Sequence, residues 1–478
     1  MGNLLKFIFL AGLFFVTFKM FGIYIIPGTG AFILIFLLFI VPLYLYCFFF
    51  NFKNFTNYLY RVFTLPYFKY YFIFLGFVLL TTIVHMLLGF YHPPFGRYII
   101  HMKDFFTPAV IVIFMPILGL FLKVKMKSII KMLYFIIYFV SLVAVIQYLS
   151  FILNLSFINV IIGFFTNLRA YVYNSDTGQE AMRVFSIFGE ASTVGQFVFI
   201  TLPFAVNIDR IKEKIFANKY IDKIIKLTIL PFSLLAVIFT KSPIYLILCF
   251  GALFVLEVIK YRKLIKKHLL IALPSLIILG VTFVGIMAVV SGSMADTFLT
   301  RISTTVANMG SMEGLVTEEA SLATRIIAYY WQFLAFTQNI FFGCGLNNVE
   351  TFLNVINVHT MTNMPMTPEN IKMVYIVQEV IGVNRSLVWS FLAEFGLVGT
   401  GLYFIFFFKN LSVAKKLKNI FTSETDYHTL ENISQSFIMI FIIGFYNLNA
   451  NNTTVWWLYG IILAYVYIAK YKPQEINN

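Results

Sequence analysis

The chain has 478 residues, of which 60% are hydrophobic and 12% are charged, and its mean hydropathy is +0.88. Soluble domains carry about 45–50% apolar and about 25% charged residues, so this composition excludes an ordinary soluble protein. The net charge of +15 does not indicate nucleic acid, because the Lys and Arg residues stand in short clusters between apolar runs. Anionic lipid headgroups are the expected partner of that charge.

Apolar runs along the chain predict an all-α fold, a polytopic transmembrane helical bundle of about twelve spans that forms one integral membrane domain over residues 1–478. The first run, from Lys6 to Pro27, lacks a small-residue cleavage site, so we expect a signal anchor. In chain order, the expected spans are 7–26, 30–50, 70–90, 105–122, 132–153, 186–207, 227–240, 243–259, 269–290, 386–408, 433–448 and 455–470.

The seventh and eighth spans form one apolar stretch that Lys241 and Pro243 interrupt. Proline has no backbone N–H to donate inside a helix, so Pro243 predicts a break or a tight turn. A single helix over 227–259 would be too long for one crossing, since about 20 residues span the hydrocarbon core. The stretch therefore predicts two spans.

Most of the 35 Lys and Arg residues fall in loops on one side of this arrangement. The positive-inside rule assigns that side to the cytoplasm and places both termini there. The other side carries a loop, about 291–385, that is far longer than a helix connection needs. Within it, SLATRIIAYYWQFLAF has apolar residues at near-helical spacing after Arg325, which predicts an interfacial amphipathic helix.

A few basic residues are expected on the outer side, where the positive-inside rule disfavours them. A single outward Arg usually contacts a headgroup or caps a loop, but several at the mouths of spans are better explained by an anionic substrate. Arg183, Lys241 and Arg385 each adjoin a span. Arginine offers fixed, bidentate donors to phosphate and stays charged at any working pH.

The sequence has no GxxxxGK phosphate loop, no HExxH zinc helix and no Asp-x-Asp pair, so we expect neither a metal nor another cofactor. Glu190 lies at or near lipid depth, where an ionisable group is costly and by default indicates function. It either pairs structurally with Arg183 or orients that side chain, and the two roles are compatible. His359 is a candidate general base, although most lone loop histidines have no chemical role.

The run RSLVWSFLAEFGLVGTG contains three glycines, Gly396, Gly399 and Gly401. Glycines in a membrane helix allow neighbouring helices to approach closely, so we expect helix packing here. Glu394 lies inside the same expected span and needs a partner there.

Four segments follow one another in an order that is typical of one family: RVFSIFGEAST, FTKSPIYLIL, TRIIAYYWQFLAFTQNIFFGCGLNN and RSLVWSFLAEFGLVG. They resemble motifs of the O-antigen polymerase and O-antigen ligase superfamily, and the resemblance covers about 183–408. In the ligase pattern a histidine stands where this chain has Arg385, so the resemblance favours a polymerase.

The resemblance implies a polysaccharide polymerase of O-antigen or capsule, a GT-C-like glycosyltransferase of the bacterial inner membrane. It would join oligosaccharide repeat units carried on undecaprenyl diphosphate at the periplasmic face, as in lipopolysaccharide biosynthesis. The implied partners are that lipid-linked oligosaccharide, membrane lipids, a chain-length regulator and a flippase, but no nucleic acid. The expected catalytic residues are Arg183, Glu190, Lys241, Arg325 and Arg385, and the expected substrate-binding residues are Arg301, Arg169 and His359.

Three alternatives stay open on the sequence. The nearest is an O-antigen ligase, which transfers finished glycan to lipid A–core. The second is a flippase or other transporter of lipid-linked oligosaccharides, for which the long outer loop is unexpected. The third is a structural membrane protein, in which the outward cations would have no role.

Overall fold

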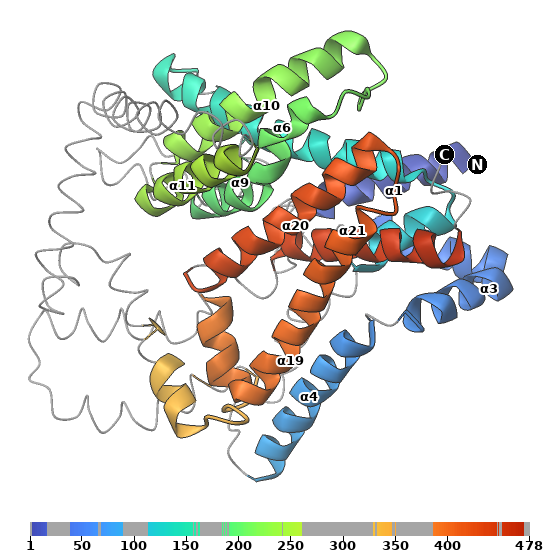
Figure 1. The fold of residues 1–478 in the computed structure, drawn as a ribbon, viewed down its shortest axis with the longest axis vertical. Coiled ribbons are helices and arrows are strands. Elements are labelled where there is room, and N and C mark those ends of the chain that lie inside the picture. The colour runs from blue at the N-terminus through green and yellow to red at the C-terminus, as the bar shows by residue number, and fades with distance from the viewer. Residues whose placement is uncertain are drawn as a thin grey trace, which may run out of the picture.

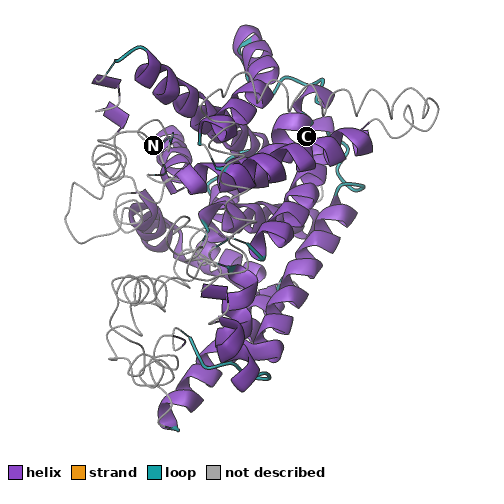
Figure 2. Ribbon diagram, turned by 90° about the vertical axis from the view of Figure 1, so that its left-hand side faces the viewer, coloured by secondary structure: helices purple, strands orange, loops and turns teal. Residues whose placement is uncertain are grey.

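The computed structural model describes somewhat more than half of the chain, and within that part the regular structure is helical (Figure 2). An isolated parallel bridge joins Ser386 to Leu448. The all-α expectation is therefore confirmed for the described part. The described residues are 2–16, 39–65, 68–88, 113–155, 157–158, 161–162, 184, 186, 188, 191–240, 242–260, 328–329, 332–346, 349, 386–446, 448 and 452–472.

The first helices are α1 (Gly2–Val16), α3 (Val41–Phe63) and α4 (Phe68–Leu87). Helix α3 is kinked at Asn51, and beyond the kink it buries Phe55, Tyr58 and Val62 at helical spacing. The hydroxyl of Tyr58 donates a hydrogen bond to the backbone carbonyl of Ile117. The chain between the expected spans 30–50 and 70–90 is therefore largely an amphipathic helix packed on the protein.

Helices α6 (Met126–Ile152), α9 (Ala191–Val206), α10 (Lys219–Phe239) and α11 (Pro243–Lys260) pack together at the top of Figure 1. Helix α9 is central, since it contacts α6, α10, α11 and α20, and every side chain from Val194 to Val206 is buried. The chain leaves α10 at Phe239 and enters α11 at Pro243, which confirms the predicted break between the two helices.

The last helices are α19 (Leu387–Leu417), α20 (Glu424–Gly444) and α21 (Thr453–Tyr471). Helix α19 breaks at Gly396, where φ is 62° and ψ is −166°. The ring centroids of Phe391 and Tyr403 are 4.7 Å apart, although twelve residues of straight helix would separate them by about 18 Å. The two parts therefore fold back on one another, as Figure 1 shows, so the expected span 386–408 does not form one straight helix.

Four helical stretches in the described part are long and apolar enough to cross a membrane, judged by length and composition. They are Lys69–Leu87, Met126–Ile152, Ala191–Arg210 and Leu387–Leu417. The protein is thus all-helical as far as it is described, and several of its helices can cross a membrane. The number of about twelve spans stays a prediction, because 269–290 and parts of other expected spans lie outside the described residues.

Helices α10 and α20 begin well before the apolar runs predict. Helix α10 starts at Lys219, where the side chain of Asn218 accepts hydrogen bonds from the next free N–H groups. Helix α20 starts at Glu424, where the hydroxyl of Ser423 accepts one from the N–H of Asp426. Such capping residues allow a helix to begin within polar sequence, and a search for apolar runs does not find that beginning.

Charged side chains from several expected cytoplasmic loops meet at one end of the bundle. Glu431 of α20 forms ion pairs with Arg210 and Lys418 at 3.5 and 3.8 Å, and its carboxylate lies 3.4 Å from Nδ1 of His428. Lys260 at the end of α11 pairs with Asp209 at 2.8 Å. We call this region, with the loop 208–218 and the starts of α6, α10 and α20, the charged end.

Candidate functional site

All eight candidate residues lie outside the described residues: Arg169, Arg183, Glu190, Lys241, Arg301, Arg325, His359 and Arg385. Whether these side chains come together therefore stays a prediction. The structure does place described residues that are close in the chain to the four cations Arg183, Lys241, Arg325 and Arg385. These neighbours are Val184, Thr240, Ser242, Tyr329 and Ser386.

Val184, which follows Arg183, is fully buried, and its N–H donates to the carbonyl of Phe239 at the end of α10 (3.1 Å). Ser186, with φ of 49°, is fixed against α6, because its N–H donates to the side-chain oxygen of Gln147 at 2.9 Å. The chain before α9 is thus held beside the turn between α10 and α11. Two stretches that each carry a candidate cation are adjacent in the fold.

Ser386, which follows Arg385, caps α19 and is bound to the end of α20. Its hydroxyl donates to the carbonyl of Gly444 at 2.8 Å and accepts a hydrogen bond from the N–H of Trp389. Tyr329 comes four residues after Arg325, and its hydroxyl donates to the carbonyl of Tyr446. The residues 444–446 therefore join the start of α19 to a piece of the long outer loop.

Helices α9 and α11 reach the same place. The ring of Tyr245 lies 6.4 Å from that of Tyr446, edge to face, and it covers Gly195 so closely that a Cβ there would lie 2.6 Å from the ring. Gln196, the residue after Gly195, accepts a hydrogen bond at its side-chain oxygen from the side-chain nitrogen of Asn452 (2.8 Å). Aromatic rings and amides thus connect three helices here.

We call this region the polar junction, and we define it by six residues: Gln196, Tyr245, Tyr329, Ser386, Tyr446 and Asn452. Its side chains are uncharged, and their hydroxyl and amide groups can both donate and accept hydrogen bonds. Gln196, Tyr245 and Ser386 are buried, so these groups join the helices to one another. The polar junction lies at the opposite ends of α10 and α20 from the charged end.

A second feature beside α19 escaped the sequence analysis. The turn at 340–345 inserts into the break of the helix through four backbone hydrogen bonds: Cys344 N to Ala393 O, Gly345 N to Glu394 O, Leu397 N to Ile340 O and Val398 N to Phe341 O, at 2.8–3.1 Å. In a straight helix the carbonyls of residues 393 and 394 would accept from residues 397 and 398. The turn replaces both partners, so the broken backbone keeps its hydrogen bonds away from water.

The glycines of this joint have different roles from those expected. Gly343 and Gly396 have φ of 68° and 62°, and a Cβ on either would lie 2.3–2.4 Å from backbone atoms of the opposite segment. Gly399 does allow close packing, since its Cβ would meet Phe77 of α4 at 2.5 Å, which confirms that part of the expectation. A Cβ on Gly401 would meet no described atom within 4 Å, so the described residues show no packing role there. The sequence FGCG at 342–345, in which two glycines flank a cysteine, was the signal from which this turn could have been predicted.

Two carboxyl groups of α20 at the charged end have shifted pKa values. Burial raises the pKa of Asp426, which accepts a hydrogen bond from the Tyr465 hydroxyl at 2.6 Å. A hydrogen bond from His428 lowers the pKa of Glu431, and Lys418 and Arg210 add to that effect. Both carboxyls are structural there. Within the described ranges, no three His, Cys, Asp or Glu residues are grouped so as to hold a metal ion.

Comparison of the sequence with known families finds no family model that matches, and no curated protein is similar to it. The class that the fold defines is an all-helical protein with helices that can cross a membrane.

Proposed function

We propose that the protein is a polysaccharide polymerase of O-antigen or capsule. It joins repeat units carried on undecaprenyl diphosphate at the periplasmic face of the bacterial inner membrane, and it crosses that membrane about twelve times with both termini in the cytoplasm. Four sequence segments in family order and the helices that can cross a membrane support this proposal.

The observation that carries the proposal is the meeting of segments far apart in the chain around the polar junction. The described neighbours of Arg385 and Arg325 bind the residues after α20, and that of Arg183 binds the end of α10, two residues before Lys241. A diphosphate site built from these four cations requires such an arrangement.

The proposed reaction is a glycosyl transfer. The hydroxyl oxygen of the incoming unit attacks the anomeric carbon of the growing chain, and the bond from that carbon to the diphosphate oxygen breaks. The hydroxyl proton passes to Glu190 or to solvent, and the lipid diphosphate leaves as an anion. Arg183, Lys241, Arg325 and Arg385 stabilise the charge that develops on the diphosphate, the kind of electrostatic assistance that usually contributes most to catalysis.

Deletion of the gene tests the proposal. Loss of a polymerase leaves lipid A–core capped by a single repeat unit, which gel electrophoresis of the surface glycan resolves. Bare core would indicate a ligase, and repeat units trapped on the cytoplasmic face would indicate a flippase. An unchanged ladder would exclude all three functions.

The variant Arg385→Ala tests the site in the same strain. We expect loss of polymer with normal membrane insertion, because an oriented cation on the leaving group is removed. Arg61→Ala is the matched control, since Arg61 stacks on Tyr471 in the part of the chain expected in the cytoplasm. A full-length ladder from Arg385→Ala would remove Arg385 from the site.

A further inference from the structure

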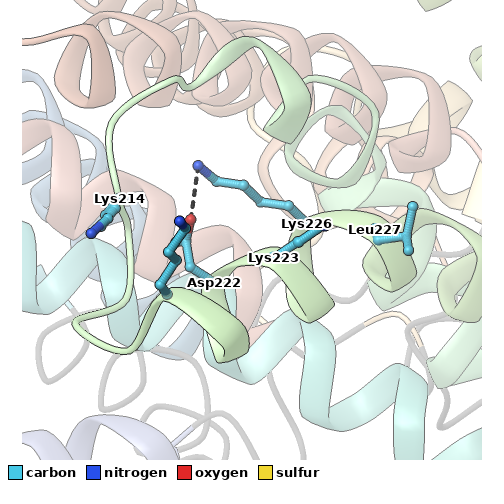
Figure 3. A pocket seen from close by; sticks show the side chains of 6 residues that line it. Lys214, Asp222, Lys223, Lys226 and Leu227 are labelled. Atoms are coloured by element: carbon cyan, nitrogen blue, oxygen red, sulfur yellow. Dashed lines mark ion pairs between the residues drawn. The ribbon is translucent and has the colours of Figure 1, made fainter.

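A hollow of about 460 Å³ opens at the charged end, between the loop 211–218 and the first turns of α10. It is lined by Lys214, Lys219, Asp222, Lys223, Lys226 and Leu227, most of which Figure 3 shows. Its size lies within the range of about 300–1,000 Å³ that small-molecule sites occupy. Four ammonium groups against one carboxylate make it an anion site by charge.

Two of these residues form a rigid frame for the hollow. Asp222 is buried, and its Oδ1 accepts hydrogen bonds from the N–H groups of Ile215 and Phe216 at 2.8 and 3.0 Å. Its Oδ2 pairs with Lys226 at 3.1 Å, drawn as the dashed line in Figure 3. Lys226 also donates to two loop carbonyls, those of residues 211 and 213. The single carboxylate of the hollow is therefore engaged in holding the loop.

The other three lysines are exposed, and no described carboxylate pairs with Lys214, Lys219 or Lys223. The loop's own acid, Glu213, pairs instead with Lys127 at 3.6 Å. The positive charge thus faces outward without compensation from the described part of the protein.

An exposed apolar stripe begins at the same place. Tyr220, Ile224 and Leu227 follow one another at helical spacing on α10 and are 78%, 53% and 71% exposed. Leu227 also lines the hollow, so charge and stripe are continuous. A soluble anion would use only the charge, whereas a phospholipid has a headgroup for the hollow and an acyl chain for the stripe.

We propose that this hollow binds one anionic phospholipid of the leaflet that faces the charged end. Its phosphate lies among Lys214, Lys219 and Lys223, and one acyl chain runs along Tyr220, Ile224 and Leu227. The site is independent of the proposed polymerase chemistry, because it is formed at the other end of α10 from the polar junction.

The test measures lipid selectivity of the purified full-length chain in uncharged detergent. Native mass spectrometry gives the ratio of apparent Kd for phosphatidylcholine to that for phosphatidylglycerol of equal chain length. A lysine near an anionic surface contributes about 1 kcal/mol, or about 5-fold. The triple variant with Lys214, Lys219 and Lys223 changed to Gln is therefore expected to lower this ratio about 100-fold.

The matched control changes Lys125, Lys415 and Lys416 to Gln, which removes the same charge from exposed positions outside the hollow. It is expected to leave the ratio within about 5-fold of the wild type. Equal losses in the two triple variants would overturn the proposal in favour of diffuse attraction. Competition by inorganic phosphate at the lipid's own concentration would overturn it in favour of a free anion.

Discussion

The joint between the turn at 340–345 and α19 gives the sharpest structural prediction. In Gly396→Ala, the new Cβ would lie 2.4 Å from the carbonyl of Phe341, and the backbone would have to keep φ of 62°. Together with ψ of −166°, this is a backbone region that is essentially limited to glycine, and another residue there costs about 1–3 kcal/mol. The clash would also break the hydrogen bonds of Leu397 and Val398 to the turn, at about 1 kcal/mol each. We expect a loss of about 3–5 kcal/mol in the free energy of unfolding.

Titration with sodium dodecyl sulfate in mixed micelles measures this loss by the unfolding of the purified chain. Gly401→Ala is the matched control, since a Cβ there meets nothing within 4 Å and alanine favours a helix by up to about 1 kcal/mol. Gly343→Ala should be as damaging as Gly396→Ala, and the double variant should lose less than the sum, because both break one joint. A Gly396→Ala variant as stable as Gly401→Ala would refute the reasoning.

Two carboxyls of α20 give opposite predictions for the pH dependence of stability. The lowered pKa of Glu431 means that its ionised form stabilises the fold above pH 4.5 and that this contribution is lost as the pH falls through the lowered pKa. Glu431→Gln should therefore lose about 1 kcal/mol at pH 7 and nothing in strong acid. The pKa of Asp426 is raised, so its contribution is full below pH 3.8 and is lost as the pH rises through the raised pKa. Asp426→Asn should therefore gain stability at pH 7 and match the wild type in strong acid. Detergent unfolding at both pH values measures the stability of each variant. A change of stability at pH 7 with the same sign in both variants would contradict the cited causes.

The helices themselves were largely predictable, because each apolar run of membrane length has to satisfy its backbone internally. The break between α10 and α11 was also predictable, since Pro243 cannot continue the hydrogen bonding of a helix. The starts of α10 and α20 were not, because Asn218 and Ser423 begin helices in polar sequence that an apolar window passes over.

The bend at Gly396 could not be predicted from its own segment. Its conformation depends on N–H and carbonyl groups of residues 340–345, which lie far away in the sequence. The candidate cations are basic residues expected on the side of the membrane where the positive-inside rule disfavours them. They lie outside the described residues. The polar junction has no sequence signal, because Ser386, Tyr329 and Tyr446 are joined through backbone carbonyls that any residue provides.

The central claim is that this chain alone polymerises lipid-linked repeat units, and reconstitution tests it most directly. Purified protein in vesicles is given undecaprenyl-diphosphate-linked repeat units, with a chelator present and without nucleotide or ion gradient. The account predicts a ladder of lengthening glycans and release of the lipid diphosphate, both lost in Arg385→Ala. Repeat units that are moved across the vesicle membrane without becoming longer would contradict it.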